Sequence, residues 1–370
     1  PVGRLVDGEA VLVHGGALML NPLLSRLPPL RLRTLFWLAL LLGCVSARAA
    51  TGLAELPATG TQPAVAVFYP TTAEGPPVQR FGFALPLVEG APPQRGNGRL
   101  VVISHGSPSN PWVNADLAVV LVQAGFVVAA PWHQRDNSDD SADAGPKAWA
   151  RRPAEVSAAI DVVARDARFG PLVDTRRVGA YGMSAGGHTM LTLAGGRWSA
   201  ATLRDHCLQH LAQDFAACTG PFIGLDGGWL DGLKLTLAGW ALRWFLRDET
   251  WHQHRDERIA AVVAGVPFAA DFDPASLAQP VVPLALITAQ QDVWLRSSFH
   301  GDAVLRQCQP RCERLADLAQ GGHAALLSPL PQRSGRIGEL IQDPPGFDRA
   351  REVPALNAQI ARWFAQRLLP

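Results

Sequence analysis

Apolar residues gather in six short runs along the chain, at residues 64–68, 100–103, 126–130, 178–181, 259–266 and 281–288. Each run has the length and continuity of a strand that is buried on both faces. Between the runs, apolar residues recur at helical spacing in 115–124, 153–167, 187–194 and 354–368. This alternation predicts an α/β fold in one domain, residues 50–370, with a mostly parallel central sheet and helices on both faces.

Residues 197–257 interrupt the alternation, because they are too many for a simple crossover between two strands. Within them, apolar residues at helical spacing predict an amphipathic helix with a tryptophan-rich face: Trp229, Leu230, Leu233, Leu237, Trp240, Ala241 and Trp244. We expect such a face to be buried. It would either pack on the surface of the domain or form a lid-like wall over a binding site, and the sequence leaves both open.

The first 49 residues have a different character. Residues 31–49 combine a basic start, a short apolar run and an Ala-x-Ala site that ends at Ala49, the order typical of a signal peptide. The apolar run is too short to span a bilayer. We therefore expect residues 1–49 to be an upstream leader and signal peptide, and the domain to be periplasmic or secreted. The alternative is a lipoprotein, with a lipid anchor on Cys44.

Charge gives no sign of a nucleic-acid partner. The chain has 370 residues with 33 Lys and Arg against 32 Asp and Glu, a formal net charge of +1, and the two signs are interspersed. Neither a basic face for a polyanion nor an acidic tail is predicted. A small molecule is the expected partner.

Four cysteines follow the predicted leader, at positions 207, 218, 308 and 312. An even number in an oxidising compartment favours two disulfides, and neighbours in the sequence are expected to pair, Cys207 with Cys218 and Cys308 with Cys312. The spacing lacks the paired Cys-x-x-Cys of a structural zinc site, so no metal is expected.

An acidic cluster also lacks the features of a cation site. It consists of Asp136, Asp139, Asp140 and Asp143. The glycine and terminal glutamate of a calcium loop are missing at the required offsets. The sequence therefore predicts a solvated loop.

A Gly-x-Ser-x-Gly pattern carries the main chemical signal. Gly182, Ser184 and Gly186 lie between the predicted strand 178–181 and the predicted helix 187–194. Small neighbours allow a sharp strand-to-helix turn that exposes a serine hydroxyl, and the amino end of the helix favours a developing anion. Ser184 is therefore the predicted nucleophile.

A serine nucleophile needs a base and an acid later in the chain. Asp292 comes shortly after the predicted strand 281–288, and His323 follows two glycines. Along the chain the three residues therefore occur in the order serine, aspartate, histidine, which is one of the orders in which catalytic triads occur. Asp271 and Asp273, which follow the preceding strand, are rival acids. Three other histidines come too early for that order and are interpreted as structural: His105, His133 and His188.

Two backbone amides are needed to stabilise the oxyanion. The amide of Ala185, directly after the nucleophile, is the first candidate. The second is the amide of Ser107, in the His-Gly turn that follows the predicted strand 100–103.

Several stretches of the chain resemble those of the bacterial dienelactone-hydrolase-like and platelet-activating-factor-acetylhydrolase-like serine hydrolases. They are AVAVFYP (64–70), VVISHG (101–106), GFVVAAPWH (125–133), RRPAEVSAAID (151–161), YGMSAGG (181–187) and GGHAALLSP (321–329). The resemblance implies an α/β-hydrolase fold and an acyl-enzyme mechanism without a cofactor, with Ser184, Asp292 and His323 as the triad.

Two departures limit what the resemblance implies about the substrate. Dienelactone hydrolases proper have a cysteine in place of Ser184, and the acetylhydrolases place their acid where this chain has Val266 and Pro267. We therefore expect a hydrolase of carboxylic esters or lactones without assigning either family's substrate. The alternatives are an amide or peptide hydrolase with the same triad, or a non-catalytic binding protein.

Overall fold

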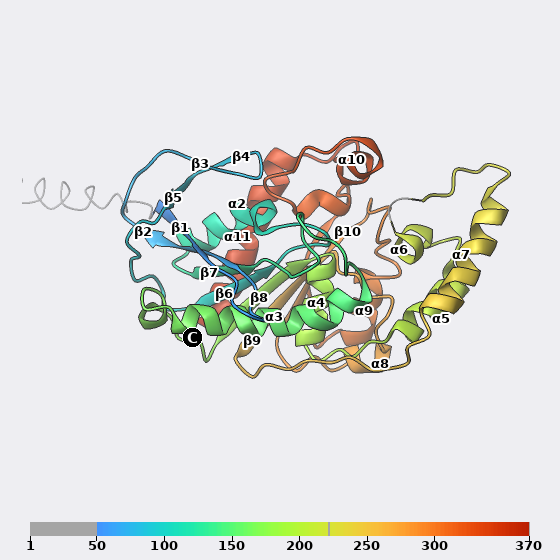
Figure 1. Ribbon diagram of the computed structural model, residues 1–370, viewed down its shortest axis with the longest axis horizontal. Helices are drawn as coiled ribbons and strands as arrows, with labels where there is room; N and C mark the ends of the chain where they lie inside the picture. Colours follow the sequence, from blue (N-terminus) through green and yellow to red (C-terminus); the bar gives the residue numbers. More distant parts are fainter. Residues whose placement is uncertain (1–49, 221–222, 370) are drawn as a thin grey trace, which may run out of the picture. The chain divides into compact units, whose positions relative to one another are not determined.

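The computed structural model describes residues 50–220 and 223–369, and a nine-stranded sheet lies at its centre (Figure 1). The strand order is β11-β10-β9-β8-β6-β7-β2-β1-β5. Neighbours from β7 to β11 pair in parallel, whereas β2 pairs antiparallel with both β1 and β7. The strands are β1 (Ala50–Leu56), β2 (Val65–Thr71), β5 (Leu87–Glu89), β6 (Leu100–Ser104), β7 (Val127–Pro131), β8 (Val178–Met183), β9 (Ile259–Gly265), β10 (Leu284–Ala289) and β11 (Glu313–Leu318). A separate hairpin joins β3 (Val78–Arg80) and β4 (Phe83–Leu85).

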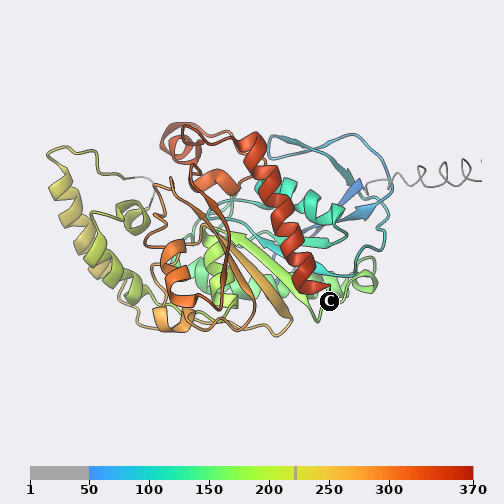
Figure 2. The ribbon, with the colours of Figure 1, turned by 180° about the vertical axis from the view of Figure 1, so that it is seen from behind.

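Helices cover both faces of this sheet (Figures 1 and 2). Along β6, Val101 and Ile103 pack with α2 (Ala115–Gln123) and α11 (Arg349–Leu368). Leu100 and Val102 point to the other face, where they pack with α3 (Pro146–Arg165), α4 (Ala185–Leu193) and α9 (Gly301–Cys308). The continuous apolar runs are explained by this arrangement, because both sides of each strand must be apolar.

The predicted α/β class with a mostly parallel sheet is confirmed, and each of the six predicted strands is present. Two predicted helix starts are wrong. Helix α3 begins at Pro146 and not at 153, and α11 begins at Arg349 and not at 354. In both cases a proline that resembled a helix start, Pro153 or Pro354, lies inside the helix.

Residues 197–257 form three helices between α4 and β9, namely α5 (Ala200–His210), α6 (Phe215–Thr219) and α7 (Asp231–Phe245). The ends of the segment are joined, because Trp198 and His252 exchange two backbone hydrogen bonds of 3.1 and 2.8 Å. The remaining short helices are η2 (Pro111–Asn114), η3 (Gly170–Leu172), α8 (Pro274–Leu277), η4 (His323–Leu326) and α10 (Gly335–Ile341).

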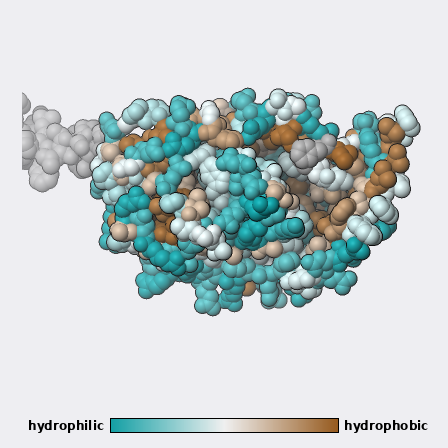
Figure 3. All heavy atoms as spheres, viewed as in Figure 1, coloured by the Kyte–Doolittle hydropathy of each residue, from teal (hydrophilic) through white to brown (hydrophobic). Residues whose placement is uncertain are grey.

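The expectation that the tryptophan-rich face of α7 is buried is wrong. Trp229 is 90% exposed and Trp240 68% exposed, and Figure 3 shows hydrophobic side chains at the surface over α7. The reason is that α7 is apolar on two sides. It packs on α5 near Gly239, and Leu242 is buried there, which leaves the tryptophans on the outer side.

The two predicted disulfides, Cys207–Cys218 and Cys308–Cys312, are both present. Among the described residues, no helix combines the length and the apolar character needed to cross a membrane. The predicted signal peptide and the alternative anchor at Cys44 lie outside the described residues.

Candidate active site

Ser184 occupies a tight turn between β8 and α4, with a backbone φ of 57° that is strained for a residue with a side chain. Glycines on both sides permit the turn. A Cβ on Gly182 would lie 2.3 Å from the carbonyl oxygen of Gly186, and a Cβ on Gly186 would lie 2.0 Å from that of Ser104. The amide of Ser184 donates to the carbonyl of Gly265 at 3.0 Å, which fixes the turn against β9.

The structure brings Ser184, His323 and Asp292 together at the carboxyl ends of the strands. Nε2 of His323 lies 3.0 Å from Oγ of Ser184, and Nδ1 lies 2.7 Å from Oδ2 of Asp292. Because an ionised carboxylate only accepts, Nδ1 carries the proton toward Asp292 and Nε2 can accept the serine proton. His323 is 5% exposed and Asp292 4% exposed, whereas Ser184 is only partly buried.

The backbone holds Asp292 in position. Its Oδ1 accepts hydrogen bonds from the amides of Trp294 and Leu295 at 2.9 and 2.8 Å. The ring of Trp294 also lies against the imidazole of His323, with centroids 4.8 Å apart. The carboxylate therefore has fixed donors on one oxygen and the histidine on the other.

The rival acids have other partners. Asp271 is buried and its Oδ2 lies 3.0 Å from Nε2 of His188, while Asp273 contacts Arg197 at the protein surface. His188 lies on α4 and is surrounded by aromatic rings, among them Trp198 at 5.0 Å. This pair ties the segment after β9 to the helix that follows the nucleophile.

The predicted oxyanion donors lie beside the nucleophile. Ala185 is the first residue of α4. In the turn after β6, a Cβ on Gly106 would lie 3.6 Å from Cβ of Ser184, so this turn passes close to the serine, and Ser107 follows directly. No hydrogen bond to a substrate tests these two amides, so their role stays a prediction.

A buried arginine holds the same turn. The Arg152 guanidinium donates to the carbonyl oxygens of His105 at 2.5 Å and Gly106 at 3.1 Å, and it pairs with Asp136 at 2.8 Å. The Ser107 hydroxyl donates to the other oxygen of Asp136 at 2.5 Å. In a trans peptide the carbonyl and the next amide point in opposite directions, so the bond to Gly106 directs the Ser107 amide away from Arg152.

The prediction that the acidic cluster is a solvated loop is therefore wrong for Asp136, which is fully buried. It is right for Asp139 and Asp140, which are exposed, and Asp143 is partly exposed beside Arg135. Sequence reasoning missed Asp136 because its partner Arg152 lies 16 residues away. The available signal was Arg152 itself, which is part of the stretch RRPAEVSAAID.

Two further buried groups complete this network. His133 contacts Glu155 through Nδ1 at 2.5 Å and Ser104 through Nε2 at 2.8 Å. Burial, together with the positive charge of Arg152, holds the pKa of His133 well below its usual value, and burial raises the pKa of Glu155. His133 is therefore a neutral hydrogen-bonding group beneath the turn after β6.

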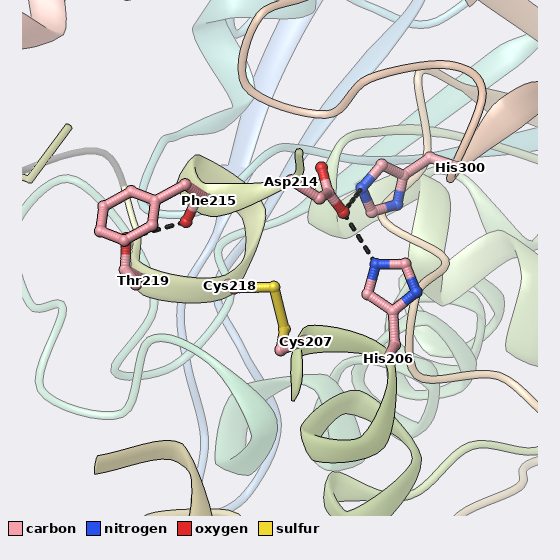
Figure 4. The surroundings of a disulfide bond; sticks show 7 residues. All are labelled: His206, Cys207, Asp214, Phe215, Cys218, Thr219 and His300. Carbon is pink, nitrogen blue, oxygen red and sulfur yellow. Dashed lines mark hydrogen bonds and ion pairs between the residues drawn. A yellow bond between two sulfur atoms is a disulfide. The ribbon is translucent and has the colours of Figure 1, made fainter. Parts of the chain in front are cut away.

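One group among the described residues has donor types suited to a metal, His206, Asp214 and Cys218 (Figure 4). The sulfur of Cys218 is bonded to Cys207 and so does not offer a thiolate. Asp214 lies 2.9 Å from His206 and 3.3 Å from His300, which connects α5 and α6 to the segment before α9. In this cluster the Asp214 carboxylate lies between the imidazoles of His206 and His300 and contacts both.

Comparison with known proteins supports the fold. Neither the protein-family models nor the curated proteins matched the sequence. Among solved structures, a ferulic acid esterase from Streptomyces cinnamoneus is similar, with a TM-score of 0.55 and 17% sequence identity over 88% of this chain and 91% of that chain. The protein has the α/β-hydrolase fold. The narrower resemblance to dienelactone-hydrolase-like and acetylhydrolase-like enzymes stays a prediction.

Proposed function

We propose that the protein is a serine hydrolase that cleaves carboxylic esters through an acyl-enzyme. The observation that carries this proposal is the position of His323, whose two ring nitrogens lie 3.0 Å from the Ser184 hydroxyl and 2.7 Å from the Asp292 carboxylate. A nucleophile, a base within hydrogen-bond reach and a group that orients the base are the parts this chemistry requires.

In the first half of the reaction, Oγ of Ser184 attacks the acyl carbon while Nε2 of His323 takes the hydroxyl proton. The Asp292 carboxylate stabilises the imidazolium that forms. The amides of Ala185 and Ser107 donate to the oxyanion, and His323 then gives its proton to the departing alcohol. Water, activated by the same histidine, releases the acid in the second half.

The preference for esters is supported by the fold, which this chain shares with a protein described as a ferulic acid esterase. The same triad also cleaves amides, so an amide or peptide hydrolase is the second candidate. The chemistry requires no cofactor. Two disulfides support the view that the protein works in the periplasm or outside the cell.

The test is hydrolysis of p-nitrophenyl esters by the purified domain beside its Ser184→Ala variant. We expect kcat to fall by about three to six orders of magnitude, because the nucleophile is lost while the fold is kept. Ser141→Ala, at an exposed serine, is the matched control and is expected to retain full activity.

Either of two results would overturn the ester assignment. Folded protein without turnover on any ester, but with turnover on p-nitroanilides that Ser184→Ala abolishes, would assign the amide alternative. Folded protein inactive on both would favour a binding protein.

A further inference from the structure

An apolar cavity of about 680 Å³ lies between residues 197–257 and the beginning of α3. Its wall includes Leu203 of α5, Phe215 of α6 and the side of α7 that carries Ala241 and Phe245, and Trp149 of α3 closes the opposite side. The volume is within the range of sites that hold small organic ligands.

Charge is neutralised at this cavity. Among the described residues that line it, Lys234 is the charged one. Its ammonium group lies 3.0 Å from Asp226 and 2.9 Å from Asp231, so its charge is paired. A ligand would therefore be held mainly by the removal of apolar surface from water, and a charged group would gain little.

Residues in the wall of the cavity contact the residues that hold the triad. The ring of Trp149 packs on Phe268 with centroids 4.6 Å apart, and the Phe268 amide donates to the carbonyl of Ser184 at 3.2 Å. Leu203 belongs to the same apolar cluster as Phe268 and Leu295, and the amide of Leu295 donates to Asp292. The wall of the cavity and the residues that hold the triad therefore belong to one apolar cluster.

We propose that this cavity takes a long apolar chain of the ester substrate, an inference that rests on the ester hydrolase function proposed above. The substrate class is then an ester with a long alkyl chain on either its acyl or its alcohol side. Each methylene buried contributes about 0.8 kcal/mol, so kcat/KM should rise by up to about fourfold per methylene until the cavity is filled.

The test fills the cavity with a larger side chain. Ala241→Trp is expected to abolish the rise in kcat/KM with chain length, measured from the butyrate to the laurate p-nitrophenyl ester. The variant should leave kcat/KM for the acetate ester within about twofold of wild type. Thr236→Trp places the same residue on an exposed part of α7 outside the cavity, and this variant should retain the rise in kcat/KM with chain length. A series of alkyl acetates distinguishes the alcohol side from the acyl side.

Direct binding separates this inference from the proposed function. A fluorescent long-chain fatty acid is expected to bind Ser184→Ala, and to bind at least tenfold more weakly when Ala241→Trp is added. If esters are hydrolysed but neither series depends on Ala241, the inference is wrong and the ester hydrolase function stands. If no ester is hydrolysed but the fatty acid binds in an Ala241-dependent way, the cavity is a chain-binding site and the proposed function is wrong. If the fatty acid does not bind either, both are wrong.

Discussion

The guanidinium of Arg152 and the carboxylate of Asp136 lie 2.8 Å apart, and both side chains are excluded from solvent. Such a pair is costly to form, because two charges leave water. It becomes favourable here because Arg152 also bonds the carbonyls of His105 and Gly106, and Asp136 also accepts from Ser107. The side chains of Arg152 and Asp136 therefore hold the turn that is expected to supply an oxyanion donor.

Removal of the arginine should destabilise the fold. Arg152→Met leaves Asp136 as a buried unpaired charge, and we expect the free energy of unfolding in urea to fall by about 3–5 kcal/mol. Arg165→Met on the same helix breaks only an exposed pair with Asp161 and should have little effect. Equal losses in the two variants would contradict a special role of the buried pair.

The Asp292→Asn variant should separate catalysis from stability. The asparagine oxygen can still accept from the amides of Trp294 and Leu295, so unfolding should change little, whereas the wrong imidazole tautomer should lower kcat by about 10⁴. The control is Asp273→Asn, at the rival acid that contacts Arg197. Ester hydrolysis and thermal unfolding of both proteins check the expectation, and a greater loss in Asp273→Asn would assign the acid to the preceding strand.

A methyl group should not be tolerated at Gly186. In Gly186→Ala the new Cβ would lie 2.0 Å from the carbonyl oxygen of Ser104, a backbone atom that cannot rotate away. We expect loss of folded protein or a fall in unfolding free energy of more than about 3 kcal/mol. Gly232→Ala in α7, where no atom lies within 4 Å, should be neutral or stabilise by up to about 1 kcal/mol. Soluble yield and urea unfolding provide the comparison.

Acid should weaken the fold through Asp214. Burial alone would raise its pKa, but its contacts with His206 and His300 lower the pKa from 3.8 to about 2. Because the folded value is the lower one, ionised Asp214 stabilises the fold above about pH 4, and this contribution is lost as the pH falls toward 2. Asp214→Asn should cost about 2 kcal/mol at pH 6, and the difference from wild type should vanish near pH 2. A difference that does not depend on pH would contradict this interpretation.

The parts of the molecule that could be predicted are those encoded in neighbouring residues. The buried strands are continuous apolar runs, and the turn around Ser184 is specified by glycines within two residues of it. Both disulfides join cysteines close in sequence. Strand β11 was missed because ERLADL is partly exposed and mixes charged with apolar residues, as an edge strand can.

The parts that could not be predicted depend on distant partners. Asp136 resembles its exposed neighbours until Arg152 is placed beside it by the fold. On α7, tryptophan spacing indicated a face to be buried, but the sequence does not show that the side with Gly239 would pack on α5 instead. The joining of Asp292 to His323 was predictable only as an order along the chain, and the 2.7 Å contact required the structure.

The backbone pairing of Trp198 with His252 gives residues 197–257 a closed base. The chain leaves the domain and returns to it at one point, and Ser184, Asp292 and His323 all lie outside that excursion. An excursion of this kind can be exchanged or lengthened as a unit, because it contributes no strand to the sheet and none of the three residues proposed for catalysis. Evolution and protein engineering could thus vary which molecules the protein accepts while Ser184, Asp292 and His323 stay unchanged.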